Sequence, residues 1–90
     1  MNFEGREFTA YSIPTNNTFV LVITAENGFL GCGYLNIEVA NKVDDVCAIV
    51  TGVKTPDEML SASVIAVSNT AAELGIKKGM TGREALLLMS

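Results

Sequence analysis

The residue best suited to chemistry in this sequence is Cys32, which stands between Gly31 and Gly33. Glycines beside a thiol let another group approach closely, and a helix N-terminus near a thiol favours the reactive thiolate. The chain has no histidine, which excludes Ser-His-Asp and Cys-His catalysis within one chain. Two interpretations follow: Cys32 is a small buried residue in a tight strand, or it is the nucleophile of a small cysteine-dependent enzyme.

In the enzyme interpretation, the groups that assist Cys32 come from a later part of the chain. Lys54 supplies the cation, and Asn36 or Thr55 supplies a hydrogen bond. The two segments must converge in the fold for this interpretation to hold. Cys47 lies in an apolar run, so we expect it to be a core residue, because unpaired cysteine is among the most buried residue types.

A second pattern concerns anion binding. Glycine-containing turns at 31–36, 52–55 and 79–83 precede the expected starts of three helices, and two of the turns carry a cation. Helix N-termini with a nearby cation bind phosphate or carboxylate, so the pattern predicts a small anionic ligand. The alternative is ordinary capping, in which these residues have a structural task alone. The candidate ligand-binding residues are Gly31, Gly33, Asn36, Thr55 and Arg83.

Known cofactor and metal motifs are incomplete in this chain. In the segment 31–36, Asn36 replaces the third glycine of the dinucleotide-binding fingerprint, and Thr51 stands where an acidic residue is needed. The segment 52–55 lacks part of a phosphate-binding loop. Two cysteines without histidine rarely complete a zinc site, and no further acids follow positions 44–45 at calcium-loop spacing. We therefore predict no metal and no cofactor.

The charge balance limits the partners. Six basic and ten acidic residues give a net charge of −4, which argues against nucleic acid, because phosphate neutralisation supplies most non-specific affinity. The first residues carry charges where a signal peptide has an apolar run, and no apolar stretch reaches the length of a membrane span. We expect a cytoplasmic protein, away from membranes, in which the cysteines are free thiols.

The N-terminal third has the pattern of strands. Residues 6–13, 19–24 and 29–34 are rich in β-branched and aromatic residues, and turn-forming residues separate them. Asn27-Gly28 is a favoured two-residue hairpin turn. These features predict a three-stranded antiparallel meander. Its middle strand is apolar on both faces and therefore needs a cover on each side.

The remainder alternates helices and strands. Helices are expected to start at Asn36, at Thr55, at Ser68 or Asn69, and at Thr81, with Gly75 ending the third of them. The strands 47–51 and 63–67, joined by a helix, predict a compact, parallel, right-handed βαβ unit. The predicted fold is α+β: a mixed sheet with helices packed on one side, in which the meander precedes the βαβ unit and the C-terminal helices.

The apolar content predicts self-association. Residues of apolar type make up 49% of a chain of 90 residues, more than so small a monomer hides comfortably. All six aromatic residues lie within the first 34 positions. We therefore expect a single domain, 1–90, with a β-rich oligomerising region at 1–35 and an α/β region at 36–90. The leading hypothesis for its function is a homo-oligomeric structural or small-ligand-binding protein.

Three blocks of the sequence carry a family resemblance. Residues 28–36, 49–55 and 75–86 resemble the signature blocks of the YunC-like proteins, a bacterial and archaeal family whose function is unknown. The resemblance extends from about residue 17 to residue 88 and implies an α+β fold. It also implies a tetramer formed through the N-terminal β region, and it implies no established activity.

Overall fold

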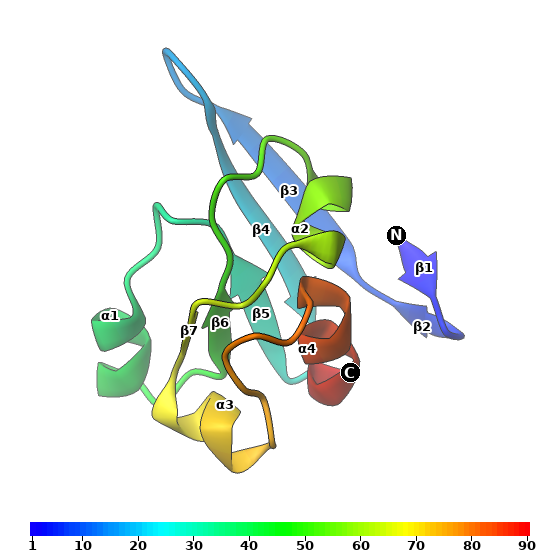
Figure 1. The fold of residues 1–90 in the computed structure, drawn as a ribbon, viewed down its shortest axis with the longest axis vertical. Helices are drawn as coiled ribbons and strands as arrows, with labels where there is room; N and C mark the ends of the chain where they lie inside the picture. Colours follow the sequence, from blue (N-terminus) through cyan, green and yellow to red (C-terminus); the bar gives the residue numbers. More distant parts are fainter.

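The computed structural model describes all residues, 1–90, and contains a five-stranded mixed sheet, a two-stranded hairpin and four helices (Figure 1). The α+β class expected from the sequence is confirmed. The order of strands in the large sheet is β3-β4-β5-β6-β7. The elements, in chain order, are β1 (Asn2–Phe3), β2 (Arg6–Glu7), β3 (Thr9–Pro14), β4 (Phe19–Ala25), β5 (Gly28–Gly31), α1 (Ile37–Lys42), β6 (Cys47–Ile49), α2 (Pro56–Ser61), β7 (Ala66–Val67), α3 (Asn69–Glu73) and α4 (Gly82–Met89).

The predicted meander is present as β3, β4 and β5, each antiparallel to the next. The hairpin turn between β4 and β5 differs by one position from the expectation. Glu26 and Asn27 form the turn, and Gly28 is already paired with Ala25 as the first residue of β5. Glycine is required there for another reason: a Cβ at this position would lie 2.7 Å from the carbonyl oxygen of Val46.

The predicted parallel pairing of strands 47–51 and 63–67 is wrong. The strands that form there, β6 and β7, are antiparallel, and the parallel neighbours are β5 and β6, which α1 connects. The reason is the position of α2, which contacts β3, β4 and α4 instead of running back along β6. The chain therefore does not return to the start of β6, and it runs back beside β6 in the opposite direction.

The helices also do not all lie on one side of the sheet. Along β6 the side chains alternate between the two faces, as in any strand. Ala48 and Val50 belong to the main core, together with residues of α2, α3 and α4. Cys47 and Ile49 pack against Ala40 of α1 in a second, smaller cluster. Three helices therefore cover one face, and α1 alone covers part of the other.

The predicted helix starts are confirmed by their caps. Asn36, Thr55, Ser68 and Thr81 each accept a hydrogen bond from a backbone N–H in the first turn of α1, α2, α3 and α4. The backbone N–H and hydroxyl of Thr81 both donate to Glu84, which lowers the pKa of that carboxyl group. The cap of α2 lacks this reciprocal bond, because the Glu58 carboxylate accepts instead from the backbone N–H of Lys54.

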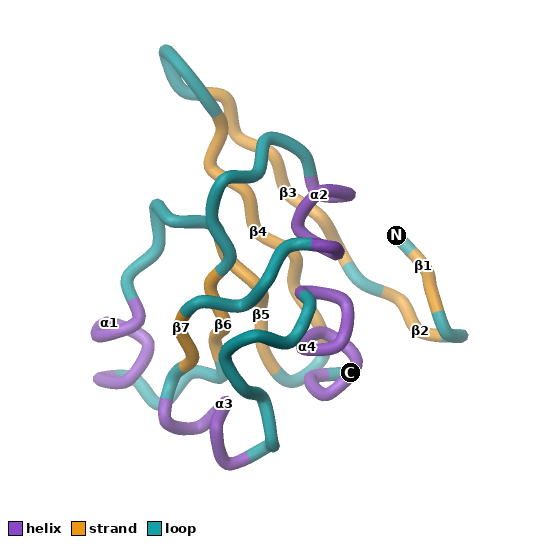
Figure 2. The backbone as a smooth tube through the Cα atoms, in the orientation of Figure 1, coloured by secondary structure: helices purple, strands orange, loops and turns teal.

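The short elements are linked by long loops (Figure 2), which follow β5, β6 and α3. As Figure 1 shows, the loop after β5 runs to α1 and the loop after β6 runs to α2, away from each other. None of the four helices has the length and hydropathy needed to cross a membrane.

Candidate functional site

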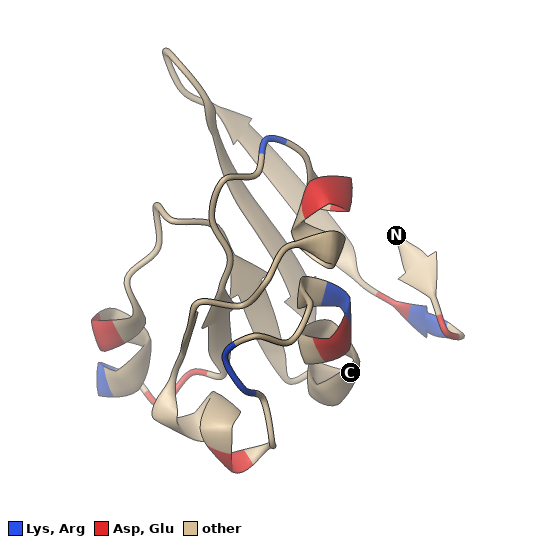
Figure 3. Ribbon diagram, viewed as in Figure 1, with Lys and Arg blue, Asp and Glu red and all other residues tan.

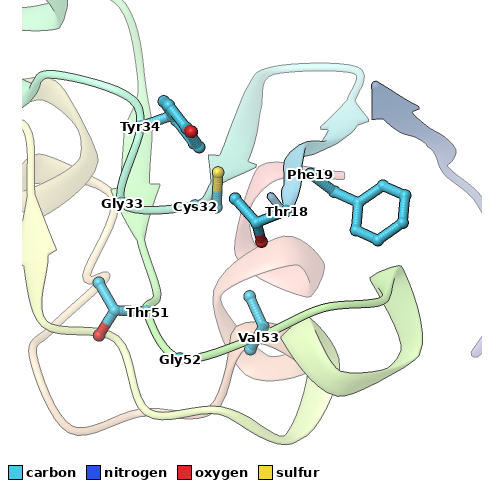
Figure 4. A pocket seen from close by; sticks show the side chains of 8 residues that line it. All are labelled: Thr18, Phe19, Cys32, Gly33, Tyr34, Thr51, Gly52 and Val53. Carbon is cyan, nitrogen blue, oxygen red and sulfur yellow. The ribbon is translucent and has the colours of Figure 1, made fainter. Parts of the chain in front are cut away.

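A cavity of about 290 Å³ opens where the carboxyl ends of β5 and β6 separate. Its walls come from three places: the turn before β4 together with the first residue of β4, the loop after β5 and the loop after β6 (Figure 4). Four of the eight lining residues are apolar, and none is charged. The lining residues are Thr18, Phe19, Cys32, Gly33, Tyr34, Thr51, Gly52 and Val53.

Cys32 is the most deeply buried side chain of this cavity and is only 5% exposed. Its Sγ accepts a hydrogen bond of 3.3 Å from the backbone N–H of Leu21, which fixes the side chain beside β4. The thiol hydrogen donates to no other group of the protein. Figure 4 shows the sulfur directed between the side chains of Tyr34 and Thr18. The thiol therefore belongs both to the core and to the wall of the cavity.

A second hollow adjoins the first. It has a volume of about 450 Å³, and the two hollows share Gly33, Tyr34 and Thr51. A Cβ on Gly33 would lie 3.2 Å from Cγ2 of Thr51, so this glycine keeps the passage beside Thr51 open. Asn36 lines the second hollow, and its side-chain oxygen accepts from the backbone N–H of Glu38 as the cap of α1.

Lys54 and Thr55 do not line the cavity that contains Cys32. They lie at the start of α2, where the hydroxyl oxygen of Thr55 accepts from the N–H of Glu58 at 3.2 Å. The proposed nucleophile and the proposed cation are therefore not part of one cavity wall.

Gly31 and Arg83 also lie outside the cavity. Gly31 is buried in β5, where a Cβ would collide with Cδ1 of Leu35. Arg83 forms an ion pair of 3.1 Å with Glu4 and stacks over the ring of Phe3, with 4.5 Å from Cζ to the ring centroid. Of the five predicted ligand-binding residues, only Gly33 and Asn36 line either hollow.

Cys47 is a core residue, as expected, with 1% exposure. Burial raises the pKa of its thiol to about 12, and the negative charge of Asp45 adds to this effect. Because Cys47 packs with α1 and Cys32 packs in the main core, the two thiols lie on opposite faces of the sheet.

Six lining residues were not identified from the sequence: Thr18, Phe19, Tyr34, Thr51, Gly52 and Val53. The signal that could have found most of them is the parallel pairing of β5 with β6. Ligands of open α/β sheets bind beyond the carboxyl ends of parallel strands. The sequence predicts a parallel pair at 47–51 and 63–67, whereas the parallel pair is β5 with β6, so its carboxyl edge was not a predicted ligand site.

Residues 31–89 of the chain match the family model described as domain of unknown function (DUF1805). The chain belongs to the DUF1805 family. The family match begins at the last residue of β5, so it includes both loops that form the cavity and leaves out β1 to β4.

Two relatives agree with this DUF1805 assignment. The uncharacterized protein YunC of Bacillus subtilis (strain 168) is 38% identical over 90 residues, which cover 96% of this chain and 89% of that protein. The crystal structure of TA1206, a protein of unknown function from Thermoplasma acidophilum, matches with a TM-score of 0.80 and 34% identity over the whole of both chains. The resemblance to the YunC-like proteins is thereby confirmed, and neither relative's name assigns an activity to the family.

Proposed function

We propose that this protein works as a homo-oligomeric module that assembles through the bare face of β3 and β4. The observation that carries the proposal is the exposure of Tyr11 and Ile13, which are 50% and 57% exposed. In the register of the sheet they lie opposite Val22 and Val20. Because side chains alternate along a strand, these four residues, named here the outer patch, lie on the face opposite the buried Leu21 and Ile23. Val20 also packs against the edge of the main core.

The outer patch continues a face that is covered elsewhere. Phe29 of β5 is paired with both Thr24 of β4 and Cys47 of β6, so all three point to the same side as the outer patch. At β6 this side is covered by α1. At β3 and β4 no element of the chain covers it, and a second copy of the chain supplies the missing layer.

The charge distribution supports a self-complementary contact. No charged residue occurs between Glu7 and Glu26, and β3 and β4 are uncharged along their whole length (Figure 3). Two copies of such a surface bring no like charges together. Large apolar patches on small proteins commonly mark interfaces. The four-subunit state is the one that the YunC-like resemblance implies.

The test is the mass of the protein in solution, measured by light scattering and by sedimentation. One chain has a mass of 9.5 kDa. We expect the mass in solution to be a multiple of this value, and four times this value for a tetramer. Ile13→Lys places a charge in the outer patch and is expected to lower the mass, with unchanged circular dichroism. Leu74→Lys is the matched control, since Leu74 is 44% exposed at the end of α3, and it is expected to keep the wild-type mass.

A single-chain mass for the wild type would overturn the proposal. So would an Ile13→Lys variant that keeps the full wild-type mass, because a buried lysine without a partner is costly at any true interface. An equal loss of mass in Leu74→Lys would show that the variants act through general instability.

The alternative function is a small cysteine-dependent enzyme, and the position of Cys32 at an open cavity favours it. In this alternative Lys54 approaches Cys32 as its activating cation, although it lies outside the cavity wall in this structure. We then expect Lys54→Gln to slow the alkylation of Cys32 in a Cys47→Ala background. Lys42→Gln, in α1, is the control. Equal alkylation rates in the two variants would remove Lys54 from the chemistry.

A further inference from the structure

We infer that the cavity between the diverging ends of β5 and β6 is a binding site for a small uncharged molecule that has an apolar part and a hydrogen-bond acceptor. This inference concerns a different surface from the outer patch and does not depend on assembly. Its three supports are the topology of the sheet, the chemistry of the cavity wall and the state of one thiol.

The topology produces the cavity. Among the paired strands of the large sheet, only β5 and β6 are parallel, so their carboxyl ends lie at the same edge. From that edge the chain leaves toward α1 on one face and toward α2 on the other, as described above. Two connections that part in this way leave a crevice between them, and such crevices are where open sheets bind ligands.

The wall chemistry selects an uncharged ligand. Neither the cavity nor the adjoining hollow has a charged lining residue. The hollows elsewhere on the molecule differ: one contains Glu26, Asp44 and Asp45, and another contains Arg6 and Glu7. A charged ligand placed against the uncharged wall loses water and gains no counter-ion, which is unfavourable. Phe19 and Val53 offer apolar contact, and the threonine hydroxyls offer hydrogen bonds.

The thiol of Cys32 adds an unused donor. The side chain is more than nine-tenths buried, its Sγ already accepts from Leu21, and its S–H has no acceptor within the protein. A thiol is a weak donor, so an acceptor on a ligand adds one weak hydrogen bond to the apolar contacts of the cavity. Figure 4 shows the sulfur between the side chains of Tyr34 and Thr18, so a hydrogen-bond acceptor of a ligand bound beside these two residues can pair with the S–H.

The first experiment measures how charge controls access to Cys32. Three methanethiosulfonate reagents are compared on the Cys47→Ala variant by intact mass: the neutral methyl reagent, the anionic sulfonatoethyl reagent and the cationic trimethylammonioethyl reagent. In each case the Cys32 thiolate attacks the reagent's sulfenyl sulfur, a disulfide forms, and methanesulfinate leaves. Each rate is divided by the rate for the same reagent on the urea-unfolded chain, which removes intrinsic differences in reactivity.

We expect the neutral reagent to react at least about tenfold faster than either charged reagent on this normalised scale, since excluding one charge need only cost about 1.4 kcal/mol for that ratio. A fastest reaction with the anionic reagent would overturn the inference in favour of an anion site. Equal suppression of all three reagents would also overturn it, because Cys32 would then be reached only when the fold opens.

The second experiment tests non-covalent binding with N-methylacetamide as the probe. The backbone amide resonances of Gly33 and Gly52 are expected to shift in a saturable way, and acetate is expected to leave them unchanged. Thr51→Val keeps the shape of the cavity and removes a hydroxyl, so it should weaken the effect. Thr24→Val, outside the cavity, should not. No saturable shift with the amide, or an equal shift with acetate, would contradict the inference.

Discussion

Among single residues, the two cysteines illustrate how position decides chemistry. Both stand in or beside neighbouring strands, yet Cys32 reaches a cavity, whereas Cys47 lies under α1 with 1% exposure. Burial first, and the charge of Asp45 second, raise the pKa of Cys47 to about 12 from a reference value of 9.0. The folded protein therefore holds the Cys47 proton over a pH range in which the unfolded chain has already lost it.

This difference predicts a pH-dependent loss of stability. The stabilising contribution is fully present below pH 9.0 and is lost as the pH rises toward about 12. Within that window the free energy of unfolding falls by up to about 1.4 kcal/mol per pH unit for one proton. Urea unfolding of the wild type and of Cys47→Ala, with a reductant present, measures the two slopes. The variant is expected to show the flatter slope, and parallel slopes would contradict the assignment.

Among the elements, the closest approach lies between α2 and α4. Gly82 opens α4, and a Cβ there would collide with the carbonyl oxygen of Met59 and lie 2.7 Å from Cδ2 of Leu30. Gly82→Ala must push α4 away from both α2 and β5. Overpacking of this kind typically lowers the free energy of unfolding by about 1–3 kcal/mol. Because the added Cβ collides with backbone, which cannot move as a side chain can, we expect Gly82→Ala to lie at or above the upper end of this range.

Gly75→Ala is the matched comparison. Gly75 has a φ of +89° after α3 and has no neighbour within 4 Å of its would-be Cβ. Its substitution costs only the backbone strain of a left-handed residue, about 1–2 kcal/mol. Chemical unfolding of both variants should therefore rank Gly82→Ala as the less stable. The reverse order would show that the contact of α4 with Met59 is looser than the structure has it.

Features that depend on adjacent residues could be predicted from the sequence, whereas features that depend on distant residues could not. The caps at Asn36, Thr55 and Thr81 were predictable because a cap depends on a few adjacent residues. The partner of β6 was not, because periodicity says that a strand is buried and not which strand lies beside it. The position of the β4–β5 turn also depended on a distant residue, Val46, which closes over Gly28.

In the candidate site, too, residues recognisable from their sequence neighbours were predicted, and residues brought in by the fold were not. Cys32 and Gly33 were identified from their types and immediate neighbours, and both line the cavity. Thr18 and Thr51 join them only because β4 and β6 flank β5 in the sheet. Lys54 was close to the cavity in sequence, but the start of α2 places it outside the wall.

For the whole molecule, the proposal of assembly links stability to concentration. The outer patch is apolar, so covering it removes apolar surface from water in the folded state alone. Anything that binds the folded state and not the unfolded state raises the apparent stability by mass action. Each tenfold dilution then lowers the apparent free energy of unfolding by about 1.4 kcal/mol per mole of dimer, and by more for a tetramer.

We therefore expect the Tm of the wild type to rise with protein concentration and the Tm of Ile13→Lys to stay constant. The increase should persist at high salt, because no charged residue lies in β3 or β4 for salt to screen. Differential scanning calorimetry over a hundredfold range of concentration, at low and high salt, makes both comparisons. A wild-type Tm independent of concentration would contradict assembly. If high salt abolishes the increase in Tm with concentration, the interface is a charged surface and not the outer patch. The surface around the ion pair of Arg83 with Glu4 is one such candidate.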